Sequence, residues 1–308
     1  MSYLIGIGIS IVGHLCNGLG MNLQKYAHTV STDKSLIKRP SWQLGMLCLI
    51  LSEVLNFVAL SMNPASIISP LGSFGVIFST IFGTLFFHES INFKGVIGIL
   101  LITTGTVLTV ITGPSNSKDL TVAEFQVLVK SKTSIIFYLI IASIIIALFI
   151  IGHSNWLCMV ILASHFAGNS IILSKTLAVF VKLSVTKKNQ LANLLPYGIL
   201  IFMLGCIVLQ LRFINKAMET QKSYVVNGLY FSLLNIMTIL SATVLFGEMI
   251  SISPLGKLGF SFGIVMVTCG VFFLSQETQS EPPEEKEPLL PRSSKKRTLS
   301  NAGIPTNV

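Results

Sequence analysis

An acidic residue in the middle of an apolar stretch is the feature of this sequence with the clearest chemical meaning. Glu53 lies among Leu, Val and Phe residues, and Asn56 and Asn63 follow it in the same stretch. At about 100° per residue of an α-helix, these three side chains lie within an arc of roughly 80°. An ionised group inside a bilayer costs about 2.5–3.5 kcal/mol on insertion scales, so we expect Glu53 to face a cavity or a charged partner.

Three further apolar stretches carry polar side chains at helical spacing. Such stripes, when they meet in a helix bundle, can line a hydrophilic pathway. A single Asn, however, usually serves helix packing, and a single His usually forms a structural hydrogen bond. The candidate pathway residues outside the Glu53 stretch are His14, Asn17, Asn169, Lys175 and Asn235.

These side chains form an oxygen-rich set, with one carboxylate among several amides and no clustered thiolates. Hard cations prefer oxygen ligands, and Mg²⁺ keeps several waters and needs only one or two carboxylates. We therefore take Glu53 as the candidate anchor for Mg²⁺. A polar organic substrate fits the same groups equally well. A structural ion pair between Glu53 and Lys175 is a further alternative.

The composition requires a membrane to position these residues. Hydrophobic residues make up 52% of the chain and charged residues 11%, whereas a soluble domain carries about 25% charged residues. The mean hydropathy is +0.77. Because the alternation of a β-barrel is absent, we expect an all-α polytopic membrane protein. The net charge of +9 is concentrated in loops and at the C-terminus, which indicates membrane topology and not nucleic-acid binding.

Sequence signatures of enzymes and cofactor sites are missing. The five cysteines lie in apolar stretches without CxxC spacing, which argues against zinc or redox chemistry. The sequence has no P-loop, no metalloprotease helix motif and no credible Ser/His/Asp order. We therefore expect neither an enzyme nor a resident cofactor.

Nine stretches have about the length needed to cross a hydrocarbon core. They are Tyr3–Gln24, Trp42–Ser61, Ala65–Phe87, Phe93–Thr112, Ile135–Ile151, Trp156–Phe180, Leu194–Leu211, Tyr224–Phe246 and Leu258–Ser275. With the first loop in the cytosol, 13 Lys and Arg residues lie on the cytosolic side and 7 on the other. The positive-inside rule then puts the N-terminus outside and the C-terminus in the cytosol.

An internal echo indicates how these spans are organised. The segment 84–89, TLFFHE, ends the third span, and the segment 243–248, TVLFGE, ends the eighth. Spans that are five apart cross in opposite directions, so Glu89 and Glu248 would lie at opposite faces of the membrane. That is an inverted repeat, which supplies the two related states of an alternating-access carrier. A helix cap or a solvated helix end is the simpler reading of each Glu.

The C-terminal segment differs in kind from the rest of the chain. We expect a transmembrane transporter domain over residues 1–275 and a disordered cytosolic tail over 276–308, which is polar and contains proline. In this tail Glu285, Leu289 and Leu290 match an acidic dileucine sorting pattern, which clathrin adaptors would read. A merely solubilising tail is the alternative.

Several segments resemble the NIPA-type magnesium transporters. They are SEVLNF at 52–57, NPASIISPLG at 63–72, LRFINKAME at 211–219 and ATVLFGE at 242–248. The resemblance implies the drug/metabolite transporter fold, with two inverted halves and nine or ten spans. It also implies Mg²⁺ as substrate, at the plasma membrane and endosomes. His14 and Asn17 depart from the family, which is mostly small and apolar there.

Together these observations predict a secondary or facilitative transporter of Mg²⁺, and of related divalent cations, through a central cavity between two inverted halves. The lipid bilayer is then the principal partner of the chain. One alternative is a metabolite or nucleotide-sugar exchanger of the same superfamily, in which Lys175 binds an anionic group. Another is a non-transporting trafficking regulator that acts through its tail.

Overall fold

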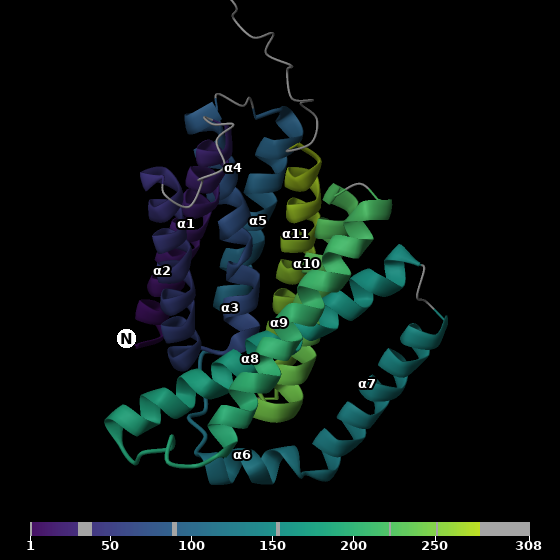
Figure 1. Cartoon of the computed structure of the whole chain (residues 1–308). Helices are drawn as coiled ribbons and strands as arrows, with labels where there is room; N and C mark the ends of the chain where they lie inside the picture. Colours follow the sequence, from purple (N-terminus) through teal and green to yellow (C-terminus); the bar gives the residue numbers. More distant parts are fainter. Residues whose placement is uncertain are drawn as a thin grey trace, which may run out of the picture.

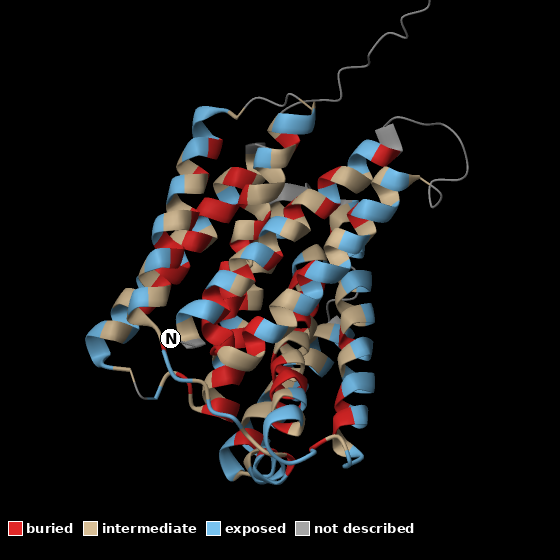
Figure 2. Ribbon diagram, turned by 90° about the vertical axis from the view of Figure 1, so that its left-hand side faces the viewer, coloured by how far each residue is buried: buried red, intermediate tan, exposed pale blue. Residues whose placement is uncertain are grey.

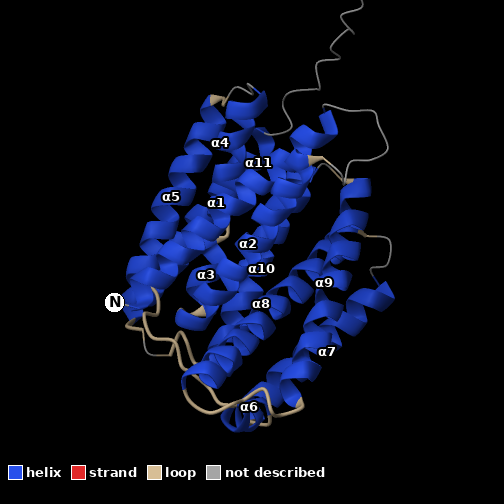
Figure 3. Ribbon diagram, turned by 60° about the vertical axis from the view of Figure 1, so that its left-hand side comes forward, coloured by secondary structure: helices blue, strands red, loops and turns tan. Residues whose placement is uncertain are grey.

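The chain forms a bundle of α-helices (Figures 1 and 3). The computed structural model describes residues 2–29, 39–87, 91–151, 155–221, 223–250 and 252–277, and no strand occurs within these ranges. The helices are α1 Ser2–Thr29, α2 Pro40–Met62, α3 Ala65–Leu71, α4 Ser73–Phe87, α5 Phe93–Thr112, α6 Val122–Val129, α7 Lys132–Ile151, α8 Trp156–Thr186, α9 Leu195–Thr220, α10 Ser223–Phe246 and α11 Pro254–Glu277.

The predicted all-α membrane architecture is confirmed. Nine helical segments in the described residues are long and apolar enough to cross a membrane, with α3 and α4 together forming the third. Many large apolar side chains point away from the bundle, among them Ile111 and Ile150, which are 74% and 77% exposed. Figure 2 shows this outward exposure beside the buried interior. Because a soluble protein rarely exposes apolar patches of this extent, lipid is the expected surrounding.

Several helices are longer than the apolar stretches that predicted them. Helix α8 runs on to Thr186, past the predicted end at Phe180, and its 31 residues span about 46 Å. The short helix α6 was not predicted, although its start carries a recognisable signal. Thr121 and Glu124 form a capping box, in which each side chain bonds the other residue's backbone N–H. Hydropathy reports burial in lipid, whereas a helix continues for as long as its backbone hydrogen bonds do.

The third span is broken in the membrane interior, between α3 and α4. Pro70 has no N–H, so it cannot donate to the carbonyl of Ser66 one turn earlier. The N–H of Gly72 donates to the carbonyl of Ser69 at 3.1 Å, a tighter turn than that of an α-helix. All seven residues of α3 are buried. This short helix packs against α10, α5, α1, α2 and α8, and it is therefore the central element of the bundle.

The contact between α5 and α11 is the most extensive contact between two helices in the described residues. Glycines allow these two helices to pack closely. A Cβ on Gly98 would lie 2.9 Å from the carbonyl oxygen of Gly270, and a Cβ on Gly105 would lie 2.7 Å from that of Gly263. The order of these contacts shows that the two helices run in opposite directions. Small residues at such positions let helix backbones approach in lipid, where the hydrophobic effect does not hold helices together.

Helix pairing repeats between the two halves of the chain. Helix α1 packs on α2 and α4, and α8 packs on α9 and α10 in the same way. The corresponding helices (α1 and α8, α2 and α9, α4 and α10, α5 and α11) are each five spans apart, so they cross in opposite directions. This pattern agrees with the inverted repeat predicted from the sequence. Helix α7 has no counterpart, and in Figure 1 it lies at the edge of the bundle.

Candidate functional site

A buried ion pair joins two distant parts of the chain. The Nζ of Lys175, on α8, lies 2.5 Å from Oε1 of Glu248, in the turn after α10. The two side chains are 0% and 2% exposed. Charges this far from water are tolerated only when they are paired and their other polar positions are hydrogen-bonded. The alternative of an ion pair between Lys175 and Glu53 is therefore replaced by a pair with Glu248.

The start of α3 supplies further hydrogen bonds to Glu248. The N–H of Ala65 donates to Oε1 at 2.9 Å, and the N–H and hydroxyl of Ser66 donate to Oε2 at 3.0 and 2.6 Å. The first N–H groups of a helix have no partner within that helix, and a carboxylate stabilises them. Gly247, with φ of 67°, turns the chain just before Glu248. Glu248 is thus a helix cap, but for a helix in the other half of the molecule.

The next turn of α3 makes a second polar contact with α10. The hydroxyl of Ser69 lies 2.5 Å from Oδ1 of Asn235, whose amide nitrogen donates to the carbonyl of Phe231 at 3.0 Å. Asn235 is fully buried. The predicted pathway residue Asn235 is therefore held by protein groups on both sides of its amide.

Helix α1 brings two predicted residues against the start of α4. A Cβ on Gly75 would lie 3.7 Å from Nδ1 of His14 and 3.8 Å from Oδ1 of Asn17. A Cβ on Gly72 would lie 3.9 Å from the His14 ring. Nε2 of His14 is buried and has no hydrogen-bond partner among the described residues. Nearly all buried polar atoms are hydrogen-bonded to protein or to water, so this atom requires an additional partner.

Glu53 is exposed, and the described part of the chain gives its carboxylate no hydrogen-bond or ion-pair partner. Leu60, seven residues later, lies about 20° from Glu53 around α2, and Phe57 lies about 40° from it. Both of these apolar residues pack into the core between the halves. Glu53 therefore lies on the inward side of α2, whereas Val54, about 100° away, belongs to the exposed apolar side.

Asn56 is close to Glu53 on the same helix. Its Oδ1 is buried and lacks a partner within the described residues, as does Nε2 of His14. A Cβ on Gly13, the neighbour of His14 in α1, would lie 3.7 Å from the backbone nitrogen of Asn56. Two side chains on the paired helices α1 and α2 therefore each carry a buried atom without a partner among the described residues.

Asn169 forms a local contact on α8. Its side-chain nitrogen lies 2.8 Å from Nε2 of His165 and donates to the carbonyl of the same residue at 3.0 Å. Nothing in the described residues connects this pair with Glu53. Of the predicted residues, the structure thus brings His14 and Asn17 together at α4, whereas Asn169, Asn235 and Lys175 each have a different neighbour.

The sequence analysis did not identify Ser66 and Ser69 as site residues, and it placed Glu248 at a helix end. The two serines are three residues apart, so they lie on one face of a Pro-containing helix. This spacing could have indicated that they act together as site residues. No local pattern indicates that Glu248 bonds to Ser66, because the two residues are far apart in sequence. Glu89 and the sorting motif Glu285, Leu289 and Leu290 lie outside the described residues.

A second charged contact lies on the same side of the bundle as α6. Nζ of Lys182 lies 2.8 Å from Oδ1 of Asp119 and donates to the carbonyl of Ser61 at 3.2 Å. Gln190 accepts a hydrogen bond from the N–H of Val122, at the start of α6. These contacts join the end of α8 to the end of α2 and to the segment between the halves.

A dedicated protein cage for a metal ion is not formed by the described residues, since no group of three or more His, Cys, Asp or Glu side chains is close enough. A single carboxylate next to amides can still interact with a cation that retains most of its water.

Comparison with known proteins identifies the family. A family model described as "Magnesium transporter NIPA" matches residues 1–280. Magnesium transporter NIPA4 of Mus musculus is 29% identical over 288 residues, which cover 88% of this chain and 71% of the mouse protein. A probable magnesium transporter of Candida albicans is 24% identical, over 92% of this chain and 81% of its own length.

A plant relative is similar over most of its length. The probable magnesium transporter NIPA1 of Arabidopsis thaliana is 25% identical over 244 residues, covering 77% of this chain and 72% of the plant protein. No solved structure matches the chain. The family match extends over all nine spans, and the chain therefore belongs to the magnesium transporter NIPA family.

Proposed function

We propose that this chain carries Mg²⁺ across a membrane by secondary or facilitated transport, with Glu53 as the group that attracts the cation. The observation that carries the proposal is the state of this carboxylate. Glu53 is exposed on the inward side of α2 and unpaired among the described residues, whereas Glu248 is fully paired. The names of the relatives, which are magnesium transporters or probable magnesium transporters, support the choice of ion.

Polar atoms without a partner on α1 and α2 support a hydrated ion. Nε2 of His14 and Oδ1 of Asn56 are buried without a partner among the described residues, and ordered water is the usual partner of such atoms. Mg²⁺ dehydrates reluctantly and usually keeps several waters. In this proposal Asn17 and Asn56 contact the water shell of the ion while Glu53 supplies the charge. The membrane potential assists entry by about 2.3 kcal/mol per charge for each 100 mV.

The contacts between the two halves suggest how access alternates. Hydrogen bonds between α1–α5 and α7–α11 include those of Ala65, Ser66 and Ser69 of α3, and that of Ser61 at the end of α2. In the proposed transport cycle the two halves separate at these contacts to open the end of the bundle near α6. The inverted repeat then supplies the matching closure at the other end.

Flux through reconstituted protein tests the proposal. Purified full-length protein in liposomes with an imposed negative-inside potential should take up Mg²⁺. The rate of uptake by the Glu53→Gln variant should be lower by about tenfold or more. The matched control is Glu124→Gln on α6, because a capping box accepts either Glu or Gln. If Glu53→Gln transports at the control rate, Glu53 does not have the proposed role.

The exchanger alternative makes the opposite prediction. An anionic substrate would have to displace Glu248 from Lys175, which is fully buried in that pair. If an exchanger were correct, Lys175→Gln would abolish transport while Glu53→Gln would be tolerated. Uptake assays should therefore compare Mg²⁺, other divalent cations and nucleotide sugars with the same proteoliposomes.

Orientation and location form part of the same proposal. The distribution of Lys and Arg supports an N-terminus outside and a C-terminus in the cytosol, and an odd number of spans puts the two ends on opposite faces. The dileucine pattern at Glu285, Leu289 and Leu290 would then direct the protein between plasma membrane and endosomes. Deleting residues 276–308 should change the location of the protein but preserve flux. Loss of flux would favour a regulator that acts through its tail.

A further inference from the structure

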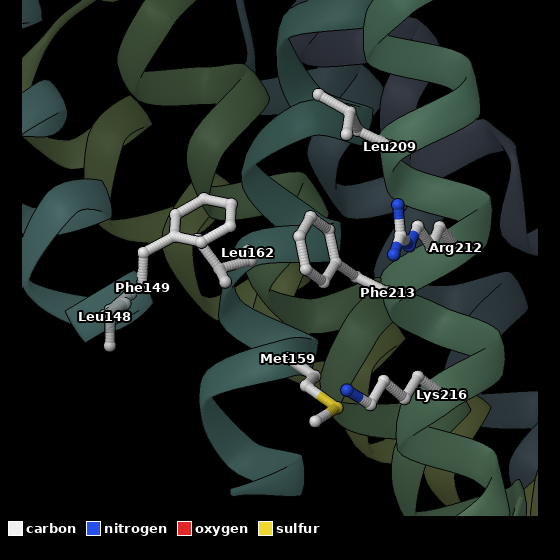
Figure 4. A pocket seen from close by; sticks show the side chains of 8 residues that line it. All are labelled: Leu148, Phe149, Met159, Leu162, Leu209, Arg212, Phe213 and Lys216. Carbon is white, nitrogen blue, oxygen red and sulfur yellow. The ribbon is translucent and has the colours of Figure 1, made fainter. Parts of the chain in front are cut away.

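A cavity of about 190 Å³ lies between α7, α8 and α9 (Figure 4). Its wall is mostly apolar and includes Phe149 of α7, Met159 and Leu162 of α8, and Phe213 of α9. Two cationic side chains of α9, Arg212 and Lys216, complete the lining. The cavity thus combines an apolar wall with two positive charges.

The two cationic groups form no ion pair among the described residues, although the exposed Glu219 follows Lys216 by three residues on α9. Arg212 and Lys216 are four residues apart, so they lie on one face of α9, where two like charges repel each other. Both are exposed, and neither has a hydrogen-bond or ion-pair partner among the described residues. A bound anion would offset this repulsion. Arg is especially suited to phosphate, because its planar guanidinium can donate two parallel hydrogen bonds.

Two aromatic rings, those of Phe149 and Phe213, form part of the apolar wall, beside the exposed helix α7. The ring of Phe213 stacks on Phe166 with centroids 6.0 Å apart and meets the edge of Phe149 at 5.5 Å. Helix α7 carries Phe149, and only 6% of the most hydrophobic 18 residues of this helix is buried. An acyl chain can therefore reach the cavity along α7 from the surrounding bilayer.

The cationic groups lie at the depth of a lipid headgroup. Arg212 is 17 residues from the start of α9 at Leu195, or about 26 Å along the helix. The hydrocarbon core is about 30 Å thick, so Arg212 and Lys216 lie near its boundary. In the proposed orientation this end of α9 is cytosolic, and the cytoplasmic leaflet is the one that contains anionic lipids.

From this combination we propose that the cavity binds an anionic glycerophospholipid. Arg212 binds the headgroup phosphate, Lys216 binds the additional negative group that makes the headgroup anionic, and one acyl chain lies against Phe149, Leu162 and Phe213. Charge complementarity and the apolar entrance select this occupant over a soluble anion, which would gain nothing from the aromatic wall. The inference does not depend on which substrate the protein carries.

Native mass spectrometry of the purified full-length protein in detergent tests the proposal. With added dioleoyl phosphatidylserine, one lipid should remain bound, whereas phosphatidylcholine should not. The Arg212→Gln/Lys216→Gln variant should bind phosphatidylserine about 30-fold more weakly, given about 1 kcal/mol for each cationic residue. The control variant Lys94→Gln/Lys257→Gln also loses two exposed positive charges, but far from the cavity, and it should bind normally.

Two further measurements separate lipid binding from the binding of a soluble anion. Phe149→Ser should also weaken phosphatidylserine binding, and inorganic phosphate should not compete with the lipid. Equal losses in the double variant and its control would overturn the proposal in favour of non-specific electrostatic attraction. Competition by inorganic phosphate, or normal binding in Phe149→Ser, would overturn it in favour of a soluble anion. If the double variant misfolds, Phe149→Ser and Lys216→Gln alone provide the same decision.

Discussion

Glu53 and Glu248 are both acidic residues within the membrane part of this chain, yet their surroundings are opposite. Glu248 is buried, pairs with Lys175 and accepts three hydrogen bonds from the start of α3. Glu53 is exposed on the inward side of α2 and has no partner within the described residues. The difference separates two uses of a costly charge: Glu248 joins parts of the fold, whereas in the proposed function Glu53 attracts a mobile ion.

A similar contrast separates the polar residues at α3 and α10 from those on α1 and α2. In α3, the Ser66 hydroxyl donates to Glu248 and the Ser69 hydroxyl donates to Asn235. His14 and Asn56 each retain a buried atom without a partner in the described part of the chain. A saturated polar network makes a structure rigid, whereas an unsaturated one leaves room for water or substrate. Substitutions around α3 are therefore expected to lower the stability of the protein. Substitution of Glu53 is expected to leave stability nearly unchanged but to reduce transport.

The largest expected effect comes from breaking the buried ion pair. Lys175→Met leaves Glu248 as an uncompensated buried charge, which should lower the free energy of unfolding by about 3–5 kcal/mol. The double variant Lys175→Met/Glu248→Gln should regain much of this loss, because no buried charge is left alone. Unfolding of purified protein in mixed micelles measures both variants. A single variant as stable as the unmodified chain would show that the pair is not structural.

A smaller loss is expected at Ser66, which donates its hydroxyl to Glu248 at 2.6 Å. Ser66→Ala removes a hydrogen bond to a charged group, which is worth about 1.5 kcal/mol or somewhat more. Ser143→Ala is the matched control, since the Ser143 hydroxyl is exposed and donates only to its own helix at Ile140. Equal stability of the two variants in the same unfolding assay would contradict the proposed importance of the α3 cap.

A third carboxylate, Glu124, shows what the same group does outside the membrane. Hydrogen bonds from the N–H and hydroxyl of Thr121 lower the pKa of Glu124 below its usual value. A carboxyl with a lowered pKa contributes stability above its unfolded-state pKa and loses it as pH falls through its folded-state pKa. Thr121→Ala should therefore destabilise the start of α6 at neutral pH and have a smaller effect in acid. Hydrogen exchange of the α6 amides, compared between this variant and the unmodified chain at neutral and at acidic pH, measures the effect.

The smallest expected effect on stability is at Glu53. Glu53→Gln removes a charge that has no hydrogen-bond or ion-pair partner among the described residues, so the free energy of unfolding should change by no more than about 0.5 kcal/mol. Normal stability combined with lost Mg²⁺ flux would sharpen the contrast with Glu248. A large loss of stability would instead mean that Glu53 has a structural partner, and the two carboxylates would no longer differ in kind.

Much of the architecture could be predicted because it depends on local sequence properties. Nine spans, their approximate bounds and the inverted pairing follow from hydropathy, span length and one echoed segment, since lipid forces each apolar stretch into a helix. The break between α3 and α4 depends on Pro70 and Gly72, whose effects on the backbone are also local. The capping box that starts α6 was readable as well, although hydropathy alone overlooked it.

The sequence by itself determined which residues carry the chemistry: a carboxylate at Glu53, an ammonium at Lys175 and amides spaced along membrane helices. Only the tertiary structure decided which of these groups are paired. Lys175 meets Glu248, which is 73 residues away along the chain, and leaves Glu53 without a partner among the described residues. The physical reason is that hydropathy and helical period fix the direction of a side chain within its own helix. The identity of the group opposite depends on how distant helices pack.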